Sequence, residues 1–144
     1  MTDWQPIVLA LTRSPRALRS WRITLLVLVL VVGYLALTPK PPPGIDLGWD
    51  KLNHACAFAA MAASACFGQR SARGRPVAML ALLAYGGLIE IAQTFVPGRN
   101  GEWADLLADA VGIAVGTALA AGLIATAASG LTRRARSPGS PDSG

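Results

Sequence analysis

Residues 77–109 read VAMLALLAYGGLIEIAQTFVPGRNGEWADLLAD, which is an apolar run, a short loop and the start of a second apolar run. Pro97 and Gly98 interrupt the helical pattern, so the sequence predicts one helix over residues 77–96 and another over residues 104–128. Each is long enough to cross a bilayer, which needs about 20 mostly apolar residues. The stretch therefore predicts two membrane-spanning helices joined by a tight loop.

Two further apolar runs lie upstream of this stretch, at residues 23–37 and 52–68. The proline-rich connector at residues 39–43 separates them, because no helix continues through consecutive prolines. Small residues recur every four positions in the second and fourth runs, a spacing that lets membrane helices approach closely. They are Ala55, Ala59 and Ala63 in the second run and Gly112, Gly116 and Ala120 in the fourth. We therefore expect an all-α membrane bundle of four transmembrane helices.

The composition supports a membrane protein and argues against nucleic-acid binding. Hydrophobic residues make up 53% of the 144 residues and charged residues 15%, and the mean hydropathy is +0.45. Soluble domains carry about 25% charged residues. The formal net charge is +5, but the arginines flank apolar runs instead of covering one amphipathic surface. We therefore expect membrane lipids, and no nucleic acid, as partners.

The chain divides into three parts. Residues 1–20 predict a loose, basic, membrane-proximal arm, and residues 21–129 predict the four-helix transmembrane domain. Residues 130–144 are rich in Arg, Ser, Pro and Gly and predict a disordered basic tail. A basic segment before an apolar run is also typical of a signal peptide. No persuasive small-residue cleavage site precedes Pro39, so an uncleaved first span is the favoured interpretation.

The basic residues predict the orientation in the membrane. Most of the 13 lysines and arginines lie in the arm, in the loop at residues 69–76 and in the tail. Four spans place these three segments on one side, which the positive-inside rule makes cytoplasmic. We therefore expect a protein of the cytoplasmic (inner) membrane with both termini inside. The loops at residues 38–50 and 97–103 then face the periplasm or exterior.

Polar side chains lie in or beside these apolar runs, next to the two outer loops. They are Asp50 and Lys51 just before the second run, His54 in it, Glu90 and Gln93 in the third, Arg99 in the loop, and Asp105 and Asp109 in the fourth. Spacings of three and four residues put the members of each helical pair on one face. Ionised groups in hydrocarbon cost several kcal/mol unless they are paired or hydrated. We therefore expect these side chains to surround one hydrated pocket that opens outward.

This ordered set of motifs resembles the VanZ-like family of small bacterial membrane proteins. The resemblance spans residues 21–128 and rests on three motifs: Asp50-Lys51-x-x-His54, Glu90-x-x-Gln93-x-Phe95-Val96-Pro97-Gly98-Arg99 and Asp105-x-x-x-Asp109-x-x-Gly112-x-x-x-Gly116. In the family the position of Asp109 is often asparagine, so this chain departs there by one more carboxylate. The resemblance implies a cell-envelope role. The founding member is associated with teicoplanin resistance, but the family brings no agreed biochemical activity.

Binding is the first function that fits these residues. The pocket would hold an anionic envelope molecule, such as a lipid headgroup, a lipid-linked glycan or a glycopeptide, and contribute to envelope homeostasis or antibiotic tolerance. Lys51 and Arg99 would bind its phosphate or carboxylate groups. The remaining polar side chains would orient its other groups; they are Asp50, His54, Glu90, Gln93, Asp105 and Asp109.

An intramembrane hydrolase or transferase acting on a lipid-linked substrate is the alternative. His54 and Glu90 would then be the catalytic base and acid. Asp50 would orient His54, and Arg99 would stabilise a developing oxyanion. The sequence has no serine elbow and no phosphate-cradling glycine loop that would identify the reaction, and Cys56 and Cys66 are interpreted as small packing residues.

A metal-assisted form of this enzyme would bind a divalent ion. The ligands would be His54, Glu90, Asp105 and Asp109, whose nitrogen and oxygen donors suit a hard or borderline ion. The sequence lacks a tight ligand spacing such as His-Glu-x-x-His, so no cofactor is favoured. A proton-coupled transporter would use the same residues, but four spans leave one chain little room for alternating access, so it would require oligomers.

Overall fold

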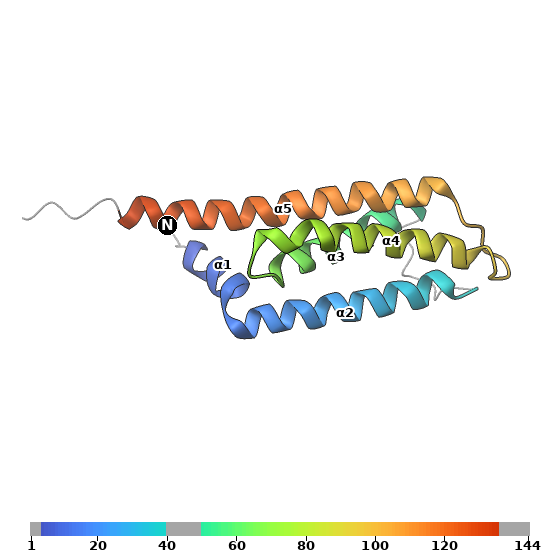
Figure 1. The fold of residues 1–144 in the computed structure, drawn as a ribbon, viewed down its shortest axis with the longest axis horizontal. Coiled ribbons are helices and arrows are strands. Elements are labelled where there is room, and N and C mark those ends of the chain that lie inside the picture. The colour runs from blue at the N-terminus through green and yellow to red at the C-terminus, as the bar shows by residue number, and fades with distance from the viewer. Residues whose placement is uncertain (1–3, 40–49, 136–144) are drawn as a thin grey trace, which may run out of the picture.

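The computed structural model describes residues 4–39 and 50–135, and this part of the chain is helical without strands. The elements are α1 (Trp4–Arg13), α2 (Pro15–Leu37), α3 (Asp50–Phe67), the 3-10 turn η1 (Ala72–Gly74), α4 (Arg75–Gln93) and α5 (Trp103–Ala135). The four long helices run lengthwise beside one another, and the short α1 lies at one end, in contact with α2 and α5 (Figure 1). The predicted all-α class is confirmed.

Three helical segments are long and apolar enough to cross a membrane: Pro15–Leu37, Ala72–Gln93 and Trp103–Ser129. They match the first, third and fourth predicted spans. The second predicted span, α3, does not reach the same hydropathy, because alanine, serine and polar residues replace long aliphatic side chains in its sequence DKLNHACAFAAMAASACF. Helix α3 contacts α2, α4 and α5, so protein covers much of its surface.

Helices α3 and α5 pack closely through small residues. A Cβ atom at Gly112 would overlap the backbone carbonyl oxygen of Ala55, and one at Gly116 would overlap that of Ala59. Neither position tolerates a side chain without a shift of backbone. The four-residue spacing of small residues therefore allows the close helix approach that the sequence predicts, and it fixes the register of α3 against α5.

The apolar core lies around α3. Its buried members are Phe58, Met61, Ala62, Ala65, Leu82, Ile89 and Ile113. Helix α2 covers this core with partly buried aliphatic side chains, and the Tyr85 hydroxyl donates to the carbonyl oxygen of Val29 to join α4 to α2. The outer faces of α2, α4 and α5 expose residues such as Leu30, Leu80 and Leu119, as a lipid-facing surface requires.

The N-terminal residues correct one prediction. Residues 4–13 form α1, and the residues from Pro15 onward already belong to α2, so the described part of the predicted arm is helical and not loose. Ser14 accepts a hydrogen bond from the Ala17 N–H at 3.2 Å, and Pro15 suits the first turn of α2. The Trp21 indole donates to the Leu11 carbonyl at 2.8 Å and holds α1 against α2.

The C-terminal helix is longer than predicted. Helix α5 continues past Ala128 to Ala135, because the alanine, leucine and arginine there are good helix formers, so the disordered tail does not begin at residue 130. Residues 136–144 and the connector at residues 40–49 lie outside the described residues, and the predictions for them stay predictions.

Candidate functional site

Three helices bring His54, Glu90 and Asp109 together at the end of the bundle where α3 and α5 begin and α4 ends. His54 lies in the second turn of α3, Asp109 in the second turn of α5 and Glu90 in the last turn of α4. The Nδ1 atom of His54 is 2.9 Å from Asp109 Oδ1 and 3.9 Å from Glu90 Oε1. We call these three residues the inner cluster.

The inner cluster is almost enclosed by the bundle. The Asp109 side chain is fully buried, and the side chains of His54 and Glu90 are 12% and 10% exposed. Helix α4 accommodates the Asp109 carboxylate at Gly86, where a Cβ atom would overlap Asp109 Oδ2. The cluster is therefore held by backbone packing, and larger side chains at position 86 would disturb it.

Two carboxylate oxygens of the inner cluster have no donor. Glu90 Oε2 accepts a hydrogen bond from the backbone N–H of Glu102 at 2.8 Å. Glu90 Oε1 and Asp109 Oδ2 are buried without a hydrogen-bond partner among the described residues. Buried acceptors left unpaired are costly, and native structures usually supply each of them with a donor from the protein, from water or from a ligand.

A more exposed rim lies beside the inner cluster. The Lys51 ammonium is 3.2 Å from Glu102 Oε2 and 3.2 Å from Asp105 Oδ1. The side chain of Lys51 is 35% exposed and that of Glu102 56%, whereas that of Asp105 is 4% exposed. Asp50 is exposed and lies close to both His54 and Asp105. The rim links the buried cluster to the surface of the bundle.

Gln93 and Arg99 do not join the inner cluster as predicted. The Gln93 amide donates to the Ala36 carbonyl at 3.1 Å, and the Arg99 guanidinium donates to the carbonyl oxygens of Leu35 and Thr38 at 3.2 and 3.3 Å. The last carbonyls of a helix lack donors within the helix, so both side chains cap the C-terminal end of α2. The side-chain donors of Gln93 and Arg99 therefore stabilise the end of α2.

Glu102 is the site residue that sequence reasoning missed. Its carboxylate pairs with Lys51, and its N–H binds Glu90. The signal was present, because Glu102 is an acidic residue just before the start of α5 and three positions before Asp105. Its carbonyl accepts the Asp105 N–H at 2.9 Å in the turn that opens the helix.

The donor set can hold a cation or move a proton. Ligand atoms of His54, Glu90 and Asp109 lie within 4.8 Å of one another, and so do those of Asp50, His54 and Asp105. One nitrogen and two carboxylates suit a borderline divalent ion. A carboxylate on one ring nitrogen of a histidine also orients the ring and leaves the other nitrogen for proton transfer. Either triad uses the same His54 ring.

The chain matches the family model described as VanZ/LLP1 over residues 9–125, which is more than half of the chain. This range includes the inner cluster, the rim and all four long helices except the end of α5. Comparisons with curated proteins and with solved structures gave no match. The predicted family is thus confirmed by a match that contains every motif on which it was based: the chain belongs to the VanZ/LLP1 family.

Proposed function

We propose that this VanZ/LLP1 protein crosses the cytoplasmic membrane with all four long helices and presents its polar cluster to the periplasm or exterior. The 18 residues of α3 extend about 27 Å at 1.5 Å per residue, close to the roughly 30 Å of a hydrocarbon core. The protein around α3 supports a span of low hydropathy, because lipid does not have to solvate all of its surface.

Cysteine labelling tests this orientation. In a variant with Cys56 and Cys66 replaced by serine, a cysteine at position 99 should react with an impermeant maleimide in intact cells. A cysteine at position 73 should react only after permeabilisation. The opposite pattern would invert the proposed topology, and labelling of both positions in intact cells would exclude four spans.

We further propose that the cluster binds the donor-bearing part of an envelope headgroup, such as the ammonium of a lipid or the hydroxyls of a lipid-linked glycan or glycopeptide. The buried, donorless oxygens of Glu90 and Asp109 carry this proposal. Ammonium and hydroxyl groups supply the hydrogen bonds that these oxygens lack, and bonds to ionised acceptors are stronger than neutral ones.

The charges near the site favour such donors over phosphate. Lys51 already binds two carboxylates, and Arg99 caps α2, so neither cation is free to neutralise an anion. An anionic molecule would place its amine or sugar at the inner cluster and its phosphate elsewhere. In this proposal Lys51 and Arg99 stabilise the fold, whereas the sequence led us to expect them to bind the ligand.

Binding measurements with defined probes test the ligand class. Teicoplanin and phosphatidylethanolamine should bind the detergent-solubilised protein more tightly than phosphatidylcholine, whose headgroup has no hydrogen-bond donor. Glu90→Gln should weaken that binding about tenfold, the effect of one charge-assisted hydrogen bond. Ser64→Ala is the matched control, because Ser64 is a buried polar residue of α3 that bonds within its own helix. Equal binding by Glu90→Gln and the parent protein would refute the proposal.

A second variant, Glu90→Leu, distinguishes a loss of headgroup binding from a failure to insert into the membrane. Glu90→Leu should still enter the membrane, because an apolar residue suits the bilayer, but it should lose headgroup binding. Binding retained in this variant would remove Glu90 from the site.

Acid–base catalysis on a lipid-linked substrate is the second candidate, and the His54–Asp109 contact favours it. Asp109 would hold Nδ1 and leave Nε2 to take a proton from water or a substrate hydroxyl. Release of phosphate or glycan from a polyprenyl diphosphate or its sugar conjugate in proteoliposomes would be measured. Loss of turnover in His54→Gln but not in Ser64→Ala would support an enzyme, and turnover retained in His54→Gln would exclude this one.

A further inference from the structure

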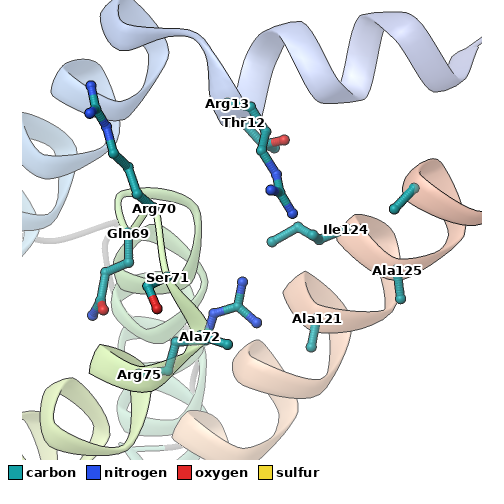
Figure 2. A pocket seen from close by; sticks show the side chains of 11 residues that line it. Thr12, Arg13, Gln69, Arg70, Ser71, Ala72, Arg75, Ala121, Ile124 and Ala125 are labelled. Atoms are coloured by element: carbon teal, nitrogen blue, oxygen red, sulfur yellow. The ribbon is translucent and has the colours of Figure 1, made fainter.

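A cavity lies at the opposite end of the bundle from His54. Its volume is about 470 Å³, and it is open on one side and lined by the end of α1, the connection between α3 and α4, and the second half of α5 (Figure 2). The sequence places Arg75 at the start of α4, whereas Glu90 lies in its last turn, so the two sites are separated by the length of that helix. We call this space the basic cavity.

Three arginines line the basic cavity, and two of them reach into it. Figure 2 shows the guanidinium groups of Arg13 and Arg75 extending into the space beside α5, while Arg70 extends away toward the N-terminal helices. Every ion pair found among the described residues involves Lys51 or His54, so no carboxylate there neutralises these arginines. The cavity therefore concentrates positive charge.

Arg75 carries the clearest sign of an absent partner. Its Nε atom is buried and has no hydrogen-bond partner in the part of the chain that the structure describes. Arg22, at the same end of the bundle, differs because its Nε donates to the Gly68 carbonyl at 2.9 Å and so caps α3. A basic residue that only marks the cytoplasmic side does not need its Nε atom buried without an acceptor.

The walls of the cavity differ in polarity. Ala121, Ile124, Ala125 and Ala128 of α5 form an apolar wall opposite the arginines. On the polar side, the Ser71 oxygen accepts the Arg73 N–H, which leaves the Ser71 hydroxyl hydrogen available to donate. A ligand that matches both walls has an anionic group joined to an apolar chain.

We propose that the basic cavity binds the phosphate of an anionic phospholipid, with the start of its acyl chains against α5. Arginine binds phosphate through charge-assisted hydrogen bonds in a fork geometry. Basic pockets between membrane helices at the headgroup level are suited to such lipids. This site is independent of the headgroup site proposed at His54, which has the opposite charge.

Native mass spectrometry of the full-length protein in detergent tests the proposal. Phosphatidylglycerol, phosphatidylcholine and inorganic phosphate are added separately. One phosphatidylglycerol molecule should bind in preference to phosphatidylcholine. In the double variant Arg13→Gln/Arg75→Gln, the affinity for phosphatidylglycerol should fall about 25-fold. This corresponds to roughly fivefold for each basic residue near an anionic headgroup. Arg75→Lys should lose less, because the charge remains.

The matched control removes the same charge outside the cavity. Arg16→Gln/Arg73→Gln changes two exposed arginines that do not line it and should bind phosphatidylglycerol as the parent protein does. An equal loss in this control would show that surface charge alone attracts the lipid and would overturn the proposal. Inorganic phosphate binding as tightly as the lipid would overturn the lipid as ligand. Phosphatidylcholine binding equally well would overturn the requirement for an anion.

Discussion

The two ends of this bundle carry opposite charges and deal with them differently. At the His54 end, carboxylates of α4 and α5 meet the basic side chains of α3 inside the protein. At the Arg75 end, the arginines of the basic cavity find no carboxylate among the described residues. Folding itself assembles the first site, whereas the second has charge left for a ligand. Substitutions at the first end should therefore change stability as well as headgroup binding, whereas those at the second should change phospholipid binding with little effect on stability.

Asp109→Ala should have the largest effect on stability. It removes the partner of His54 from a fully buried position, and leaving a buried polar group unpaired costs about 1–3 kcal/mol, to which the cavity left by the carboxylate adds. Reversible unfolding in mixed detergent would measure the loss. Asp50→Ala is the control, because Asp50 is exposed and should matter far less. Similar losses in the two variants would mean that the pair at the His54 end does not hold the helices together.

Gly116→Ala should come next, since it tests the packing beneath the acidic end. The new Cβ atom would meet the Ala59 backbone, which cannot move away as a side chain would, so we expect a loss of about 1–3 kcal/mol. In Gly122→Ala, on the same helix, the added atom meets nothing within 4 Å. The control should therefore keep or raise the unfolding free energy. Unchanged stability in Gly116→Ala would contradict the close approach of α3 and α5.

The smallest expected effects come from removing one positive charge at each end of the bundle. Lys51→Met removes the partner of the buried Asp105 and should lower the melting temperature slightly, by less than Gly116→Ala does. Arg70→Gln should leave it unchanged or raise it, because that arginine pairs with no described carboxylate and lies among other cations. Thermal melts in detergent would compare the two. A larger loss in Arg70→Gln would break the distinction between the ends.

Much of the fold was predictable from local patterns. The apolar runs located the helices, and the spacing of Gly112 and Gly116 indicated the face on which α5 meets another helix. The grouping of His54 with Glu90 and Asp109 followed from the cost of charge in hydrocarbon. These features depend on periodicity and burial, which a single sequence displays directly.

Other features depend on contacts that the sequence does not display. Arg99 and Gln93 lie near the cluster in sequence and depth, but the unpaired carbonyls at the end of α2 attract their donors. The helix at residues 4–13 is held by the distant contact of Trp21 with Leu11 and by α5. The basic cavity combines α1, a turn and α5, so its arginines appeared in the sequence only as a signal of orientation.

A double-mutant cycle on His54 and Asp109 tests the central claim most directly. The variants His54→Gln, Asp109→Asn and their combination would be unfolded in the same detergent, and the three losses of free energy compared. Direct contact between the two side chains predicts a coupling of about 1 kcal/mol, within the range measured for polar pairs in membrane proteins. Losses that add within about 0.3 kcal/mol would mean that α3 and α5 do not bring these residues together.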